Sequence, residues 1–160
     1  MEPPGQHFHQ KTLLVVNTGS IKKRFVFQRL NKLGVKLIVL HKEKNWAQPY
    51  VQHWILADTY NQSEAVSAVK DFLSNNFGQK IDGAISFWED DVPLLARICS
   101  DLKLVGNSNE AANNTRNKLR MQEVFKKTGL PFIKQVLLKS KIDLNQAVKE
   151  IGFPAVLKPV

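Results

Sequence analysis

The chain has 160 residues, of which 43% are hydrophobic and 23% are charged, and its formal net charge is +9. This composition is typical of a folded globular protein and excludes a largely disordered one. No run approaches the ~18 consecutive apolar residues of a membrane-spanning helix, so no membrane span is expected. The single cysteine, Cys99, excludes an internal disulfide and favours a reducing, cytoplasmic location.

The positive charge is concentrated towards the C-terminal end. Residues 1–113 carry 13 Lys and Arg against 11 Asp and Glu, a net charge of +2. Residues 114–160 carry 10 against 3, a net charge of +7. Such a segment could face phosphates, nucleic acid or a membrane surface, or simply carry solvated helix lysines. The lysines are not interleaved with aromatic residues and no nucleic-acid-binding signature occurs, which argues against nucleic acid.

Residues 1–11 are rich in Pro and Gly and predict a disordered leader. Four short apolar strands then alternate with helices, and the predicted strands span residues 12–16, 36–40, 53–57 and 83–87. The first helix places Val26, Leu30 and Leu33 on one face, and the second begins at an Asn61–Glu64 capping box. The third is predicted to bury five residues, which are Val92, Leu95, Ala96, Cys99 and Leu102. Alternation of this kind predicts an α/β fold with a parallel sheet and helices on both of its faces.

Ligands of such folds bind beyond the carboxyl ends of the strands. The first strand ends in a turn containing Gly19 and Ser20, where backbone N–H groups could hold an anion, or where Ser20 simply caps the helix. The fourth strand is followed by Glu89, Asp90 and Asp91. Three acidic residues could bind a metal ion, but the helix dipole also favours acidic residues in a first turn, and we prefer that interpretation. Cys99 lies on an apolar helix face and is interpreted as structural.

The composition changes at residues 113–115, and a one-turn helix before them is expected to be capped by Ser108. Beyond them the pattern predicts a helix over 115–127, a strand over 132–138, a helix from an Asp143–Gln146 capping box to Ile151, and a strand over 155–157. Lys158 follows that last strand. Because the remainder of a sheet is not encoded here, we expect an exposed apolar patch and a tendency to associate, which leaves a homodimer open.

Several stretches together resemble the ATP-grasp superfamily, including biotin carboxylase and the amino-acid ligases, with residues 86–108 most similar to the amino-acid ligase and carnosine-synthase-like branch. The stretches are Gly106–Ser108, Arg116–Met121, Thr128–Pro131 and Gly152–Val160. The resemblance implies a Rossmann-like pre-ATP-grasp domain over residues 12–113. It implies that residues 114–160 begin the ATP-grasp domain, which would be truncated.

The resemblance also implies ATP as cofactor, with Lys118 and Lys158 at positions where the family contacts the nucleotide. A lysine suits phosphate oxygens because it is a compact charge on a long stem. The family's glycine-rich loop and its Mg²⁺ ligands have no counterpart in this sequence, so we expect them outside this chain. No catalytic residue and no metal ligand is assigned here.

The implied function is that of the N-terminal portion of an ATP-dependent carboxylate–amine ligase that works through an acyl phosphate and is inactive by itself. Small carboxylate and amine substrates would be its partners besides ATP. Because Gly19, Ser20 and Glu89 share the predicted carboxyl edge of the sheet, they are assigned to substrate binding. A non-catalytic nucleotide-binding or interaction module of the same fold is the alternative, and a basic nucleic-acid-binding domain is a weaker one.

Overall fold

The computed structural model describes residues 6–158. The chain forms two compact units, the first ending at Ala112 and the second beginning at Asn113. Within the described residues, no helix has both the length and the apolar character needed to cross a membrane. Each unit is described by itself below.

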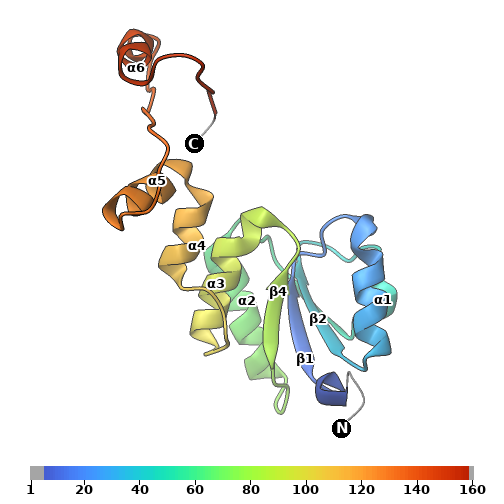
Figure 1. The fold of residues 1–160 in the computed structure, drawn as a ribbon. Helices are drawn as coiled ribbons and strands as arrows, with labels where there is room; N and C mark the ends of the chain where they lie inside the picture. The colour runs from blue at the N-terminus through green and yellow to red at the C-terminus, as the bar shows by residue number, and fades with distance from the viewer. Residues whose placement is uncertain (1–5, 159–160) are drawn as a thin grey trace. The chain divides into compact units, whose positions relative to one another are not determined.

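The first unit is built on a four-stranded sheet in which every pairing is parallel (Figure 1). The strand order is β3-β2-β1-β4. Its strands are β1 (Thr12–Val16), β2 (Lys36–His41), β3 (His53–Leu56) and β4 (Gly83–Ser86). These bounds agree with the predicted strands to within one residue at each end, and the predicted α/β fold with a parallel sheet is confirmed. Because β1 pairs with both β2 and β4, the chain reverses its direction across the sheet beside β1.

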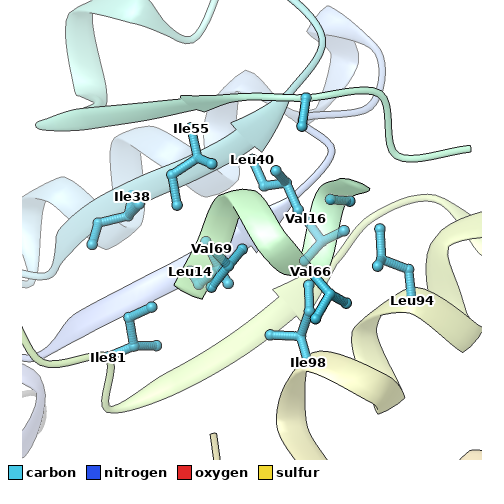
Figure 2. Packing of buried hydrophobic residues seen from close by; sticks show 12 residues of the cluster. Leu14, Val16, Ile38, Leu40, Ile55, Val66, Val69, Ile81, Leu94 and Ile98 are labelled. Carbon is cyan, nitrogen blue, oxygen red and sulfur yellow. The ribbon is translucent and has the colours of Figure 1, made fainter. Parts of the chain in front are cut away.

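Alternate residues of the central strands face opposite layers of the unit. Leu14 and Val16 pack with Val66 and Val69 of α2 (Gln62–Asn75) and with Ile98 of α3 (Val92–Asp101), as Figure 2 shows. Their neighbours in sequence turn the other way. Val15, Leu37 and Val39 pack with Phe27 of α1 (Arg24–Lys32) in a separate cluster. Helices therefore cover both faces of the sheet, α1 on one side and α2 and α3 on the other (Figure 1).

Local signals explain where these helices begin. Asn61 caps α2, and its side chain accepts a hydrogen bond from the Glu64 amide. Ser20 accepts a hydrogen bond from the Lys22 amide and caps η2, a 3-10 turn (Ile21–Lys23) that leads into α1. Short 3-10 turns also occur at η3 (Gln48–Tyr50) and η4 (Glu89–Asp91), and η4 leads into α3.

Residues 1–11 were predicted to be a disordered leader, but residues 6–11 make ordered contacts in the structure. Residues 1–5 lie outside the described residues. Residues 6–8 form η1 (Gln6–Phe8), a 3-10 turn, and the Gln10 amide donates to the Gly34 carbonyl at 2.9 Å. The His9 ring lies against Gly34, where an added Cβ would come within 2.5 Å of the ring. Residues 6–11 therefore contact the end of α1 and lead into β1.

The helices after residue 108 differ from their predicted bounds. Ser108 does cap a helix, but α4 (Asn109–Arg116) is longer than the single turn expected, and it continues past the composition change. The helix expected over 115–127 is interrupted at Asn117. The side chain of Asn117 accepts a hydrogen bond from the Arg120 amide, so α5 (Lys118–Lys127) starts anew there.

The helix expected from residue 143 is present as α6 (Asp143–Ile151), but the predicted capping box is wrong. The Asp143 carboxylate accepts hydrogen bonds from the Lys139 and Ser140 amides, both at 2.8 Å, and so stabilises the turn before the helix instead. Gln146 donates to Glu150, one turn further along the helix.

The two strands predicted in the second unit are also wrong. Residues 132–138 and 155–158 carry no strand assignment, and Lys158 therefore follows an irregular segment and not a strand. A strand is stabilised by hydrogen bonds to a neighbour, and none of the described residues supplies one here. The predicted exposure of apolar side chains does occur. Ile133, Phe153, Val156 and Leu157 are each 74–80% exposed.

We predict that Leu14→Ala destabilises the first unit by about 2–5 kcal/mol, because Leu14 is fully buried in the central strand and the change leaves a cavity. All three tryptophans lie in this unit, so tryptophan fluorescence during urea unfolding reports on it. Leu56→Ala, at a 55% exposed edge-strand position, is the matched control and should change the unfolding midpoint little. Equal losses in the two variants would contradict the described core.

Candidate functional site

The carboxyl end of β1 leads into a tight turn formed by Asn17, Thr18 and Gly19. Asn17 and Gly19 both have φ of +64°, a left-handed conformation that asparagine and glycine tolerate better than other residues. The Gly19 amide donates to the Asn17 side chain at 2.9 Å. Thr18 is fully buried, and its hydroxyl donates to the Gly19 carbonyl at 3.3 Å.

The loop after β2 holds this turn in place. The side-chain Nδ2 of Asn45 donates to the Thr18 hydroxyl at 2.9 Å, and the Trp46 indole N–H donates to the Gly19 carbonyl at 3.2 Å. The Trp46 ring also packs edge-on against Phe27 of α1, with ring centroids 4.9 Å apart. The turn is therefore fixed by a neighbouring loop as well as by its own hydrogen bonds.

This geometry limits the predicted role of the turn as an anion-binding site. The Gly19 N–H is already used within the turn, and the Ser20 hydroxyl accepts from Lys22. The helix-cap interpretation of Ser20 is confirmed, and in this conformation the Gly19 N–H is not available to a ligand. Ser20 is exposed and Gly19 is half-buried, so both still border solvent at this edge.

The acidic residues after β4 occupy different environments. Glu89 begins η4 and is exposed, whereas Asp91 is 2% exposed and is the N-cap residue of α3. An N-cap carboxylate usually accepts a hydrogen bond from the second or third helical amide. Here Pro93 is the second helical residue and has no N–H, and the Asp91 side chain makes no capping hydrogen bond. The burial of the Asp91 carboxylate is therefore not explained by helix capping.

Asp91 interacts with polar groups that follow the other three strands. Burial raises its pKa, and the opposing influence of hydrogen bonding from Thr59 and Asn17 does not cancel that rise. The exposed Asp90 beside it adds like-charge repulsion, and His41 lowers the pKa slightly. Within residues 6–158, the Oδ2 atom of Asp91 is buried without a hydrogen-bond partner. An unpaired buried carboxylate oxygen costs free energy of folding.

His41 is the last residue of β2 and is half-buried. Burial lowers its pKa, so the neutral imidazole is favoured over the imidazolium. The Glu43 amide donates to Nδ1 at 3.3 Å, which leaves the proton of the neutral ring on Nε2. His41 therefore offers one N–H donor to this edge of the sheet.

One polar side chain thus comes from the end of each strand or from the segment that follows it. We call this set the edge cluster, and its members are Asn17, His41, Thr59 and Asp91. Sequence reasoning located the edge but assigned its function to Gly19, Ser20 and Glu89 alone. The available signal was the position of each residue at the end of a strand or in the loop that follows it, together with the proline that removes one capping donor for Asp91.

Lys118 and Lys158, predicted to contact the nucleotide, both lie in the second unit and are both exposed. Lys118 is the first residue of α5, and its carbonyl is reached by the Gln135 side chain at 3.4 Å. Lys158 lies in the irregular segment after α6. No interaction between the two lysines occurs among the described residues, so their common role in nucleotide binding stays a prediction.

Two other features of the described residues bear on chemistry. No group of three or more His, Cys, Asp or Glu is placed to hold a metal ion within residues 6–158.

Cys99 is 2% exposed on α3, and burial raises the pKa of its thiol. A buried thiol with a raised pKa is a poor nucleophile, which supports a structural role.

The sequence of this chain is similar to known proteins over most of its length. The sequence model of the ATP-grasp N-terminal domain matches residues 27–106. Carnosine synthase 1 from Homo sapiens is 29% identical over 159 residues, covering 92% of this chain and 19% of the relative. The chain therefore spans about a fifth of the length of that relative.

Solved structures share the fold. Phosphoribosylglycinamide synthetase from Anaerococcus prevotii superposes with a TM-score of 0.71 at 24% identity, covering 91% of this chain and 36% of that one. N5-carboxyaminoimidazole synthetase from Staphylococcus aureus, complexed with ADP, gives a TM-score of 0.68 at 20% identity, with coverages of 91% and 37%. The chain corresponds to a little over a third of each structure.

We predict that Asp91→Asn stabilises the first unit at neutral pH, because an amide removes the buried charge. The folded-state pKa of Asp91 is raised, so its carboxylate costs nothing below the unfolded pKa and costs most above the folded pKa. The gain in melting temperature should therefore be larger at about pH 7 than at about pH 4. Asp71→Asn, at an exposed position of α2, is the control. If the melting temperature does not rise in Asp91→Asn, or rises more at about pH 4 than at about pH 7, the described burial of the Asp91 carboxylate is contradicted.

Proposed function

Because the chain belongs to the ATP-grasp N-terminal domain family, we propose that it is the N-terminal portion of an ATP-dependent ligase that joins a carboxylate to an amine. The match to the family over residues 27–106 carries this proposal. The similarity to a synthase over 92% of the chain supports it. The activity belongs to the whole protein, since the chain covers only 19% of that relative.

In the proposed reaction, the substrate carboxylate attacks the γ-phosphorus of ATP and ADP leaves, giving an acyl phosphate. The amine, in its neutral form, then attacks the acyl carbon, phosphate leaves, a C–N bond forms, and the nitrogen releases a proton. Bound Mg²⁺ would neutralise phosphate charge in such a reaction. The described residues of this chain do not supply a set of carboxylates for that ion, so its ligands are expected elsewhere in the whole protein.

The second unit would contribute positive charge towards ATP. Residues 114–160 have a net charge of +7, and both Lys118 and Lys158 are exposed and free to approach phosphate oxygens. Among the described residues, neither lysine forms an ion pair with an acidic group. A lysine whose charge is not already neutralised by the protein can form a charge-assisted hydrogen bond to phosphate.

The first unit would contribute to the substrate site through its carboxyl edge. Gly19, Ser20 and Glu89 follow β1 and β4, the neighbouring strands at which the chain reverses direction across the sheet. In open α/β sheets this position is the usual place for a ligand. The ADP bound in a solved structure of the same fold supports a nucleotide in the proposed reaction.

We predict that Lys118→Ala and Lys158→Ala each weaken ATP binding, measured by isothermal titration calorimetry in the whole protein. Loss of a hydrogen bond to a charged group costs about 1.5–3 kcal/mol, or roughly 10- to 100-fold in the dissociation constant. Lys127→Ala and Lys149→Ala, on α5 and α6, are lysine controls and should retain affinity. Unchanged ATP affinity in both test variants would remove this part of the proposal.

We also predict that Glu89→Ala raises the KM of one organic substrate in the whole protein while the KM of ATP stays unchanged. Glu89 is exposed at the carboxyl edge, so its removal should not disturb the core. Steady-state kinetics with each substrate varied in turn provides the measurement. Glu64→Ala, at an exposed position in the first turn of α2, is the control for a general loss of negative charge. The same KM values in Glu89→Ala and the unmodified protein would count against the assignment.

A further inference from the structure

The least satisfied polar group of the described residues is the Asp91 carboxyl. Its Oδ2 atom is the one buried side-chain oxygen or nitrogen in this part of the chain that lacks a hydrogen-bond partner. Capping of α3 does not use the carboxylate, because no capping hydrogen bond is formed and Pro93 removes one of the usual donors. A buried acceptor left in this state calls for an explanation other than local structure.

The surroundings of Asp91 indicate a ligand that carries hydrogen-bond donors. The other members of the edge cluster come from the ends of β1 and β2 and from the segment after β3. Asn17 and His41 are half-buried, so the cluster borders solvent at these two residues. To pair with Oδ2, a donor would have to enter between these side chains, and Oδ2 has no partner among the described residues.

We propose that Asp91 accepts a hydrogen bond from the ammonium group of a small-molecule amine that binds at the carboxyl edge of the sheet. This inference rests on the proposed function, because it assigns the amine substrate to the first unit. An ammonium group supplies three N–H donors and a positive charge. One donor would pair with Oδ2, and the charge would be compensated by the carboxylate in a setting largely shielded from water.

The charges near Asp91 favour an amine over an anionic ligand. Glu89, Asp90 and Asp91 follow one another here, and burial favours the neutral form of His41, which therefore adds little positive charge. The Gly19 N–H, which could have met an anion, is engaged within the turn. Four lysines of this edge are exposed, so water screens their positive charge more than it screens the charge of the buried Asp91. These lysines are Lys22, Lys23, Lys42 and Lys44.

The test uses methylammonium chloride as the probe and the 160-residue chain, with backbone amide NMR as the readout. Methylammonium should cause saturable shifts at residues 17, 41, 59 and 91. Tetramethylammonium chloride at the same ionic strength has no N–H group and should not cause them. The Asp91→Asn variant should weaken methylammonium binding at least tenfold, whereas the Asp71→Asn control should bind as the unmodified chain does.

Equal shifts with the two cations, no saturable shift, or unchanged binding in Asp91→Asn would each overturn the proposal. If Asp91→Asn does not fold, the pH dependence of the unmodified chain decides. Methylammonium affinity must then fall as acid protonates Asp91, whose titratable neighbours are Asp90 and His41. An affinity independent of pH would overturn the proposal. ATP is absent from this experiment, so its outcome is separate from that of the Lys118 and Lys158 variants.

Discussion

The parallel pairing of β1 with both β2 and β4 is the constraint on which the rest of the first unit depends. A parallel sheet with helices on both faces requires strands that are apolar on both sides, and β1 and β2 meet this requirement almost throughout. The alignment brings all four carboxyl ends to one edge (Figure 1). Side chains that are far apart in sequence are thereby gathered around Asp91.

The edge cluster contains a buried carboxylate whose missing hydrogen bond costs free energy of folding. The apolar clusters on the two faces of the sheet contain most of the buried side chains, and they tolerate the cost of one unsatisfied carboxylate. Pro93, in the first turn of α3, lacks one of the two amide N–H groups that usually bond to an N-cap carboxylate. Titratable groups with pKa values shifted by burial gather at functional sites more often than elsewhere, and Asp91 and His41 both belong to this class.

The first unit could be predicted well from sequence because its signals are local and agree with one another. Apolar strands, the Asn61 cap and the helix after Asp91 each specify their own element. The edge cluster could not be predicted in the same way, because it depends on strand order and on the failure of Asp91 to cap α3. Sequence reasoning took the acidic triplet as a helix start, which is right for its position but does not explain the buried carboxylate.

The second unit was predicted less well for a different physical reason. Residues 132–138 and 155–158 have strand-like composition, but strand formation depends on hydrogen bonds to a neighbour that the described residues do not contain. Helices need no such partner, and α5 and α6 are present although their starts were misplaced. Asn117 competes as a cap within the predicted helix, and Asp143 hydrogen-bonds backwards to the preceding turn.

The central claim is that the fold buries an under-satisfied carboxylate at the carboxyl edge of its sheet, in a position to meet a ligand. Carbon-13 NMR of the aspartate side-chain carboxyl groups, followed through a pH titration of the ligand-free chain, tests this claim most directly. The structure predicts that Asp91 titrates above the ordinary range of an aspartate, because burial is the largest influence on its pKa. An Asp91 carboxyl that titrates at or below that range would contradict the account.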